Sequence, residues 1–321
     1  MGKPLLWITF YLPDELIAPV KQYVDVKSWQ DAEHDMPQDE FENAAYEADL
    51  LWTVVSNQLT ADVIKRAHRL KMVANLAVGY NNIDIEAAKN AGIIVTNTPD
   101  VLADTTADLA FSLMLAAGRR IVESAKALYQ GQWQGWQVLG FTGKDIHHKT
   151  LGIIGMGDIG ELVAKRAKGF DMNLLYHNRS RKEAAEMRYG VAYRSKEDLL
   201  RESDFVIILT PLTDETRNLI AKEQLQMMKS SAILVNVARG GIVNEDDLYD
   251  ALVDGTILAA ASDVFVQEPV PTTHPLLSLS NFTATPHIGS ATVETRLAMV
   301  GRNVASLTAY LSQQDIPYRV V

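Results

Sequence analysis

Three polar side chains late in the chain, those of Arg239, Glu268 and His287, are of the types needed for acid–base chemistry on a small acid. Each follows an apolar, strand-like run, and open α/β sheets bind their ligands at the ends of such strands. An arginine binds a carboxylate and polarises a carbonyl, a histidine supplies a proton, and a carboxylate orients the imidazole and stabilises its cationic form. The set therefore suits a 2-oxo acid, although each residue alone also has a structural interpretation, as a sheet cap, a turn residue or a loop histidine.

A glycine motif with GxGxxG spacing, Gly155-Met156-Gly157-Asp158-Ile159-Gly160, follows an apolar run and precedes residues with helical spacing. Glycines at these positions let the backbone turn tightly and approach a pyrophosphate, whose charge faces the free N–H groups of a helix N-terminus. The motif predicts a bound dinucleotide, and the alternative is a strand–helix turn without a ligand. Asp158 complicates the prediction, because its carboxylate suits the helix dipole but repels a pyrophosphate unless it points outward.

The choice of cofactor is expected at the end of the next strand, where an acidic residue binds the ribose 2′-hydroxyl in NAD-dependent proteins. This chain has no Asp or Glu there and instead has Asn178, Arg179, Ser180 and Arg181. Two arginines and a serine offer charge-assisted hydrogen bonds to a 2′-phosphate. We therefore expect NADP(H) as the preferred cofactor and NAD(H) as the second candidate. The alternative is that both arginines only begin a solvated helix.

The composition is that of an acidic protein of 321 residues, with a formal net charge of −10 and no cysteine. Nucleic-acid binding needs clustered lysines and arginines, so no nucleic-acid partner is expected. The lack of cysteine excludes disulfides and thiolate metal sites, and we expect no metal ion. The first ten residues indicate a strand and not a signal peptide, and no apolar run is long enough to span a bilayer. We therefore expect a cytoplasmic protein without a membrane partner.

Strand-like apolar runs alternate with helical patterns along the whole chain, which is typical of parallel α/β architecture. The expected strands are Leu5–Phe10, Leu50–Ser56, Met72–Ala77, Ile93–Thr96, Leu151–Gly155, Asn173–His177, Asp204–Thr210, Ala232–Asn236, Leu258–Asp263 and Phe282–Ala284. We predict the α/β class with two doubly wound parallel-sheet domains, a Rossmann nucleotide domain and a flavodoxin-like substrate domain.

One long helix is expected from about Asp104 to Gln130, either shared between domains or subunits or simply buried. The predicted domains are 1–98 for the substrate (catalytic) domain and 99–286 for the dinucleotide-binding domain. A C-terminal helix within 287–321 is expected to return to the substrate domain, because the strands before it already complete a nucleotide domain.

Seven ordered segments resemble the D-isomer-specific 2-hydroxyacid dehydrogenase family, and they extend over nearly the entire chain. They are Val78–Asp84, Thr105–Asp108, Gly155–Gly160, Pro211–Thr213, Asn236–Gly241, Asp263–Pro269 and Pro286–Ser290. The resemblance implies reversible hydride transfer between a nicotinamide and a 2-oxo acid. It also implies that Arg239, Glu268 and His287 are the catalytic trio.

The resemblance further implies which residues bind the ligands. Val78 and Gly79 match a loop whose backbone N–H groups hold the substrate carboxylate, and Arg239 and His287 also contact the substrate. Asp263 matches a residue near the nicotinamide amide. The expected cofactor-binding residues are Thr106, Gly155, Gly157, Asp158, Ile159, Gly160, Asn178, Arg179, Ser180, Arg181, Thr210, Pro211, Thr216, Val237, Ala238, Arg239, Asp263, His287 and Gly289.

Within the family, the segments 145–150, 211–216 and 228–233 resemble bacterial glyoxylate/hydroxypyruvate reductases that also reduce 2-keto-D-gluconate. One departure is Asp158, where that branch more often has arginine. The resemblance implies reduction of glyoxylate, hydroxypyruvate or 2-keto-D-gluconate to D-2-hydroxy acids, with His287 as proton donor, in a homodimer joined through the nucleotide domain. The cofactor preference inferred above makes this reduction NADPH-preferring. The alternatives are an NAD-dependent dehydrogenase of another 2-oxo acid and a nucleotide-sensing, corepressor-like protein.

Overall fold

The computed structural model describes residues 2–321, which form two compact units. The first unit combines the residues up to Leu102 with Ala291–Val321, and the second is Ala103–Ser290. The divisions after 102 and 290 compare with predicted divisions after 98 and 286. The chain therefore leaves the first unit once and returns to it with its last helix.

The first unit is built on a five-stranded parallel sheet in the order β2-β1-β3-β4-β5, which is the flavodoxin-like order. Its strands are β1 (Leu5–Ile8), β2 (Asp25–Ser28), β3 (Leu50–Thr53), β4 (Met72–Asn75) and β5 (Ile94–Thr96). The strands β3 and β4 are entirely buried, as parallel strands covered on both faces must be. The sequence does not predict β2, because this edge strand alternates exposed and half-buried residues without an apolar run.

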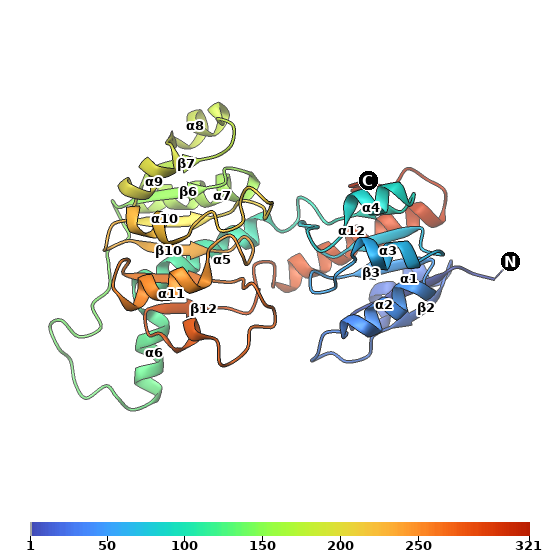
Figure 1. The fold of residues 1–321 in the computed structure, drawn as a ribbon, viewed down its shortest axis with the longest axis horizontal. Helices are drawn as coiled ribbons and strands as arrows, with labels where there is room; N and C mark the ends of the chain where they lie inside the picture. The colour runs from blue at the N-terminus through green and yellow to red at the C-terminus, as the bar shows by residue number, and fades with distance from the viewer. Residues whose placement is uncertain (1) are drawn as a thin grey trace. The chain divides into compact units, whose positions relative to one another are not determined.

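The helices of the first unit are α1 (Asp14–Lys21), α2 (Gln38–Glu47), α3 (Ala61–Arg66), α4 (Ile85–Asn90) and α12 (Val293–Leu311). The last of them, α12, contacts α1 and β4 (Figure 1). The hydroxyl of Thr292 caps its N-terminus by accepting the N–H of Thr295 at 3.3 Å. Met299 and Leu307 are buried on its inner side. The C-terminal helix is therefore part of the first unit's core.

The second unit is built on a seven-stranded parallel sheet in the order β12-β11-β10-β9-β6-β7-β8. Its strands are β6 (Thr150–Ile154), β7 (Asn173–His177), β8 (Ala192–Tyr193), β9 (Phe205–Ile208), β10 (Ile233–Asn236), β11 (Ala259–Ser262) and β12 (Phe282–Ala284). Counted from β6, this is the Rossmann order 3-2-1-4-5-6 with one further strand. The sequence does not predict β8, which is too short to show a pattern. The predicted fold class, two parallel α/β domains, is confirmed.

Two layers of helices cover the second sheet, and alternate residues of each strand face one layer or the other. Phe205 and Ile207 of β9 pack with α5, α7 and α8, whereas Val206 and Ile208 pack with α9, α10 and α11. The bounds are α7 (Asp158–Ala167), α8 (Glu183–Tyr189), α9 (Lys196–Glu202), α10 (Lys222–Met227) and α11 (Glu245–Val253), with 3-10 helices η1 (Lys168–Phe170) and η2 (Pro275–Ser278). Within residues 2–321, no helix combines the length and apolar character that crossing a membrane requires.

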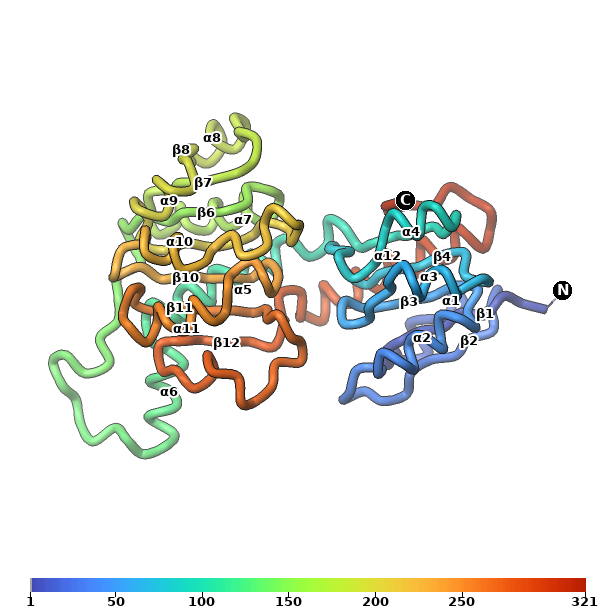
Figure 2. The backbone as a smooth tube through the Cα atoms, viewed as in Figure 1, coloured from blue at the N-terminus to red at the C-terminus, as the bar shows by residue number. Residues whose placement is uncertain are grey.

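The single long helix predicted for 104–130 is wrong, because the chain forms α5 (Ala103–Gly118) and α6 (Ile121–Tyr129). Arg120 between them has a left-handed backbone with φ 54°, which no helix can contain. The carbonyl of Gly118 accepts the N–H of Lys144 at 2.7 Å, and Arg120 holds Glu123 with two bonds of 2.6 and 2.7 Å. These contacts end α5 and redirect the chain. Beyond α6, the segment 130–143 projects from the second unit as a loop (Figure 2).

Candidate active site

The loop after β12 carries His287 and is fastened to Asp263, the first residue after β11. The buried carboxylate of Asp263 accepts the Thr285 hydroxyl at 2.6 Å and the N–H groups of Ile288 and Gly289 at 2.8 Å each. Its backbone carbonyl accepts the N–H of His287 at 2.9 Å. Burial raises the pKa of Asp263 in spite of these donors. These bonds hold the backbone of His287 in a left-handed conformation with φ 51°. The direction of its Cα–Cβ bond is therefore fixed.

His287 and Glu268 form a direct hydrogen-bonded pair, with 2.6 Å between Nδ1 of the imidazole and Oε2 of the carboxylate. The other carboxylate oxygen, Oε1, accepts the N–H of Phe265 at 2.8 Å. Burial acts to raise the pKa of Glu268, but the bonds from His287 and Phe265 and the nearby charge of Arg239 outweigh it, and the pKa is lowered. Glu268 is therefore ionised at neutral pH, and Nε2 is the imidazole nitrogen left to act on a substrate.

Arg239 lies in the loop after β10, and Asn236 at the end of that strand shapes the loop. The amide of Asn236 accepts the N–H of Ala238 at 3.1 Å and donates to the carbonyl of Arg239 at 3.0 Å. The guanidinium donates to the carbonyl of Ala238 at 2.7 Å. Burial lowers the pKa of Arg239, and the charge of Glu268 opposes this shift. The structure thus brings the three predicted catalytic residues together at the carboxyl ends of β10, β11 and β12.

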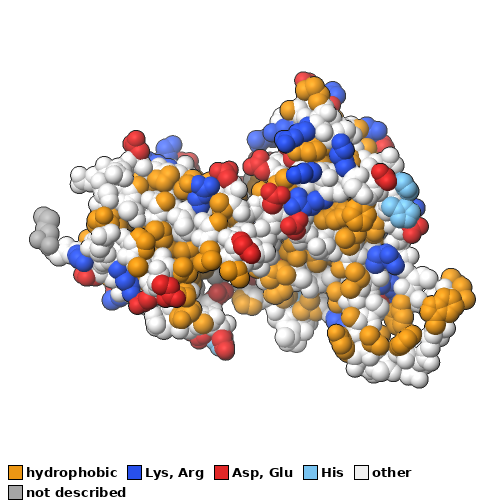
Figure 3. Space-filling model, turned by 180° about the vertical axis from the view of Figure 1, so that it is seen from behind, with side chains coloured by type: hydrophobic (Ala, Val, Ile, Leu, Met, Phe, Trp, Pro, Cys, Tyr) orange, Lys and Arg blue, Asp and Glu red, His pale blue; other side chains and the backbone are white. Residues whose placement is uncertain are grey.

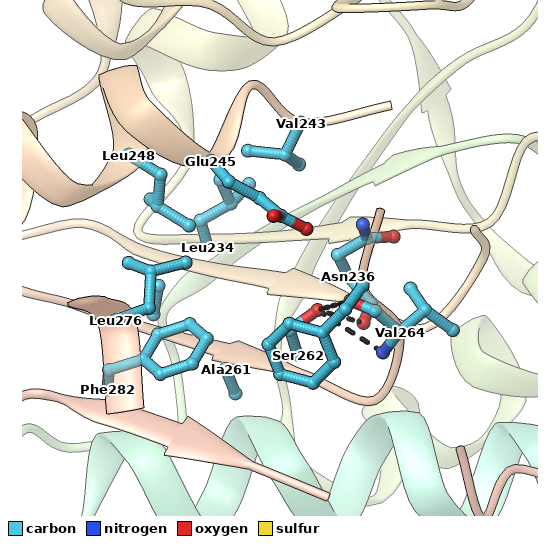
Figure 4. Close-up of a pocket in the computed structure, with 12 residues that line it drawn as sticks. Leu234, Asn236, Val243, Glu245, Leu248, Ala261, Ser262, Val264, Leu276 and Phe282 are labelled. Atoms are coloured by element: carbon cyan, nitrogen blue, oxygen red, sulfur yellow. Dashed lines mark hydrogen bonds between the residues drawn. The ribbon is translucent and has the colours of Figure 1, made fainter. Parts of the chain in front are cut away.

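A small pocket lies between α11 and the ends of β10 and β11, and Val264 and Phe265, which precede Glu268 in the chain, line part of it (Figure 4). Glu245 of α11 lines it, and its carboxylate accepts the N–H of Val266 at 2.7 Å and lies 3.1 Å from Nε2 of His274. None of the three predicted catalytic residues lines this pocket. Its apolar lining and the Glu245 contact support the turn that carries Glu268, so the pocket belongs to the framework of the site.

The glycine motif forms the turn from β6 into α7, as its spacing predicts. Gly155 has φ +103°, and a Cβ there would lie 2.7 Å from the backbone of Leu209 and Thr210, while a Cβ on Gly160 would lie 2.3 Å from the carbonyl of Gly155. At Gly157, by contrast, a Cβ would have no described atom of the chain within 4 Å. Within residues 2–321, no side chain caps the first N–H groups of α7. The turn therefore fits a pyrophosphate, which needs an open backbone face and free N–H donors.

Asp158 is the first residue of α7, and its side chain is exposed. Ile159 and Gly160 follow it in the first turn, where helix geometry leaves N–H groups unpaired. The exposure of Asp158 is compatible with the outward orientation that a neighbouring pyrophosphate requires.

The two predicted arginines after β7 differ in their partners. Arg181 binds Glu186 of α8 with bonds of 2.7 and 2.8 Å, and Glu186 also accepts the hydroxyl of Tyr176 at 2.7 Å. The bond from Arg181, followed by that from Tyr176, lowers the pKa of Glu186 to about 2. Arg179 is exposed, and within residues 2–321 its side chain makes no hydrogen bond or ion pair. Asn178 closes the turn by donating to the carbonyl of Ser180 at 3.1 Å.

The other predicted cofactor residues lie at the same edge of the sheet. Thr210 and Pro211 follow β9, and the hydroxyl of Thr216 closes their loop by donating to the Pro211 carbonyl at 2.7 Å. Val237 and Ala238 are buried after β10. Thr106 of α5 is buried beside Gly289. A Cβ placed on Gly289 would lie 3.5 Å from the methyl group of Thr106.

Val78 and Gly79 lie in the loop that follows β4 of the first unit. Their backbone carbonyls accept hydrogen bonds from two asparagine side chains, those of Asn97 and Asn75.

Sequence reasoning missed the residues that hold the predicted ones in place. Asn236, Asn75 and Asn97 all lie at or just after the end of a strand, and an asparagine at such a position is a signal for a side chain that shapes the following loop. Glu245 gives no comparable signal, because the N–H that it binds lies 21 residues further along the chain.

Comparison with known proteins places this geometry in a family. The family model "D-isomer specific 2-hydroxyacid dehydrogenase, NAD binding domain" matches residues 111–289. The glyoxylate reductase of Aeropyrum pernix is 44% identical over 325 residues, covering 100% of this chain and 96% of that protein.

Two solved structures are informative about the cofactor. The NADPH-dependent glyoxylate/hydroxypyruvate reductase of Sinorhizobium meliloti, in complex with NADP and malonate, aligns with a TM-score of 0.87 and 29% identity over 100% of this chain and 97% of that one. The D-lactate dehydrogenase of Aquifex aeolicus, complexed with NAD and lactic acid, aligns with a TM-score of 0.84 and 26% identity over 96% of each chain. Relatives thus bind either nicotinamide cofactor. By the match over its second unit and the full-length relatives, the chain belongs to the D-isomer specific 2-hydroxyacid dehydrogenase family and is an oxidoreductase.

Proposed function

We propose that this enzyme reduces glyoxylate and hydroxypyruvate to 2-hydroxy acids, the D isomer where a stereocentre forms, and that it also accepts 2-keto-D-gluconate. The observation that carries the proposal is the 2.6 Å hydrogen bond between His287 and Glu268 beside Arg239. This arrangement suits protonation of a carbonyl whose neighbouring carboxylate is bound by an arginine. Glyoxylate reductases that are 43–44% identical to this chain support the substrate class.

Each residue has a separate role in the proposed reaction. His287 donates a proton from Nε2 to the carbonyl oxygen, and Glu268 stabilises the imidazolium through Nδ1. Arg239 binds the carboxylate and polarises the carbonyl, and the N–H groups of Val78 and Gly79 serve as further carboxylate donors. A bound reduced nicotinamide supplies the hydride for the carbonyl carbon. The alkoxide and the proton then combine to give the hydroxyl group.

The second part of the proposal is a preference for NADPH over NADH. No carboxylate stands at the end of β7 to bind a ribose 2′-hydroxyl, and the exposed Arg179 is available for a 2′-phosphate. Arg181 contributes less than Arg179, because Glu186 already neutralises it. The glycine turn at the N-terminus of α7 binds the pyrophosphate of either cofactor.

The third part is a homodimer formed through an arm of the second unit, defined as α6 and residues 130–143. Apolar side chains gather on the surface of this arm (Figure 3). Those that are more than half exposed are Ile121, Leu128, Tyr129, Trp133, Trp136, Val138 and Leu139. Such a concentration is unusual for a surface that faces water, and a second copy of the chain is the proposed partner.

The activity is tested by initial rates of the purified enzyme with glyoxylate, hydroxypyruvate, 2-keto-D-gluconate and pyruvate, each with NADPH and with NADH. We expect turnover of about 1–1000 per second with NADPH and the first two acids. A preference for pyruvate would contradict the proposed substrates, and a preference for NADH would contradict the proposed cofactor. Tight NADPH binding without turnover of any acid would indicate a sensing protein instead.

The dimer is tested by light scattering of the enzyme and of the double variant Trp136→Glu/Leu139→Glu. The variant is expected to be monomeric at concentrations where the wild type is dimeric. Met187→Glu on α8 is the matched control, because Met187 is also highly exposed but lies outside the arm. A monomeric wild type, or a dimeric double variant, would contradict the assignment.

A further inference from the structure

We propose that the side-chain amides of Asn75 and Asn97 are positioning groups for the substrate carboxylate, because they turn the backbone N–H groups of Gly79 and Tyr80 away from the asparagines. The N–H of Tyr80 is thereby added to those of Val78 and Gly79 as a carboxylate donor. The inference rests on the proposed function, in which this loop binds the carboxylate of a 2-oxo acid. It adds two residues that do not touch the substrate themselves.

The loop after β4 is held by its carbonyl groups. Asn75, the last residue of β4, is fully buried, and its Nδ2 donates to the carbonyl of Gly79 at 2.9 Å. Asn97, just after the neighbouring strand β5, donates from Nδ2 to the carbonyl of Val78 at 2.8 Å. Both carbonyls therefore point at side chains of the two strand ends.

The direction of these carbonyls fixes the direction of the next N–H groups. In a trans peptide the C=O and the following N–H point in opposite directions, and both peptides here are trans. The N–H groups of Gly79 and Tyr80 must then point away from the asparagines. Within residues 2–321, the N–H groups of Val78, Gly79 and Tyr80 have no acceptor, and the side chains of Val78 and Tyr80 are exposed. Successive free N–H groups of this kind form an anion-binding concavity.

The amide of Asn75 is itself prevented from turning over. Its Oδ1 accepts Nδ2 of the buried Asn82 at 3.4 Å, and that Nδ2 also donates to the carbonyls of Val54 and Asn57 at 3.1 Å each. A rotated Asn75 amide would bring its NH2 group against the NH2 group of Asn82. The network thus selects the orientation that presents a donor to Gly79.

This arrangement explains how the loop attracts an anion without a cation of its own. A lysine or arginine would bind many anions at varied distances. Fixed N–H groups, by contrast, donate to a carboxylate that lies in one particular orientation. The carboxylate orientation sets where the neighbouring carbonyl lies. Loss of the Asn75 or Asn97 hydrogen bond is therefore expected to weaken binding of any 2-oxo acid while leaving the cofactor site unaffected.

The inference is tested with Asn97→Asp, which keeps the shape of the side chain and removes the donor, and with Asn75→Ser, which shortens the buried tether. Asn90→Asp is the matched control for Asn97→Asp, because it adds the same charge to the same unit at an exposed position outside the loop. KM and kcat for glyoxylate, the inhibition constant of oxalate, the dissociation constant of NADPH and the melting temperature are measured for each variant.

We expect Asn97→Asp to raise both KM for glyoxylate and the inhibition constant of oxalate by about tenfold or more, corresponding to about 1.4 kcal/mol. The NADPH dissociation constant should stay within twofold, and Asn90→Asp should behave as the wild type. Unchanged KM and inhibition constants in Asn97→Asp would overturn the inference, as would equal losses of glyoxylate, oxalate and NADPH binding, which indicate general damage. If Asn75→Ser fails to fold, Asn97→Asp alone decides. A wild type that does not reduce glyoxylate refutes the proposed function and is recognised before any variant is made.

Discussion

Replacing Glu268 by glutamine isolates the charge of the carboxylate from its shape. The glutamine oxygen can still accept the N–H of Phe265, which Glu268 now binds at 2.8 Å. Its NH2 group then faces Nδ1 of His287, where the carboxylate oxygen lies at 2.6 Å. An NH2 group donates to a neutral imidazole nitrogen and opposes the N–H of an imidazolium. The variant therefore favours the neutral histidine, which has lost the proton that reduction requires.

The size of this effect follows from the nature of the bond. A hydrogen bond to a charged group contributes about 1.5–3 kcal/mol, and the Glu268 carboxylate is 30% exposed, so solvent screens only part of it. This corresponds to a decrease of about 10- to 150-fold in kcat/KM for glyoxylate reduction on the alkaline side of the pH profile, where the supply of the proton limits the rate. The rate of glyoxylate reduction should decline with rising pH in both enzymes, and the decline should begin at a lower pH in Glu268→Gln. Oxidation of glycolate, which needs the neutral histidine as base, should be affected less.

The assay is a pH series of kcat and kcat/KM for glyoxylate with NADPH, with glycolate oxidation measured in parallel. A second readout is the free energy of unfolding against pH. Because the pKa of Glu268 is lowered in the folded state, its ionised form stabilises the fold above the ordinary value of 4.5, and this contribution is lost as the pH falls through the folded value. Glu268→Gln should therefore lose less stability than the wild type on acidification. A pH profile of reduction that superimposes on the wild type would refute the role of the pair.

Substitutions at three other places test the rest of the site: at Arg239, at the two arginines after β7, and at Glu245. Arg239→Lys should raise KM and lower kcat for glyoxylate by about 10²–10³ together with an unchanged melting temperature, because a lysine lacks the planar fork; a lower melting temperature with normal kinetics would assign the arginine to the fold alone. Arg179→Ser should weaken NADPH binding at least tenfold relative to NADH, whereas Arg181→Ser should have a smaller effect because Glu186 already neutralises that side chain; equal effects in titrations of both cofactors would contradict this distinction. Glu245→Ala should reduce kcat severalfold by freeing the turn that carries the catalytic carboxylate, and Glu245→Gln, which keeps an acceptor, should restore most of it; identical rates in both variants would exclude the tether.

The central strands and the loops after them are predictable from the sequence because parallel strands covered on both faces need uninterrupted apolar residues. β9 and β10 are completely buried, and the polar residues that follow them can only lie at the carboxyl edge of the sheet. His287 and Glu268 lie in loops at that edge, after the neighbouring strands β12 and β11, and this placement allows them to pair. Edge strands do not carry this signal, so β2 and β8 are not predictable in the same way.

The supporting contacts depend on tertiary structure that one-dimensional patterns do not contain. The break at Arg120 follows from the contact of Gly118 with Lys144, which no helical periodicity reveals. The neutralisation of Arg181 by Glu186 also appears only once α8 turns back toward β7. The residues at the strand ends therefore predict the type of chemistry. They do not predict which of two neighbouring arginines is paired with a carboxylate, or where a helix breaks.

The most direct test of the account compares the wild type with His287→Ala for two quantities, kcat for NADPH-dependent reduction of glyoxylate and the dissociation constant of NADPH. General acid catalysis contributes about 10²–10⁴ in rate, and in the proposed function the cofactor is held mainly by the glycine turn and the loops after β7, β9 and β10. His287→Ala is expected to lose turnover by that factor and to keep NADPH affinity within about twofold of the wild type. A variant that reduces glyoxylate at the wild-type rate would contradict this expectation.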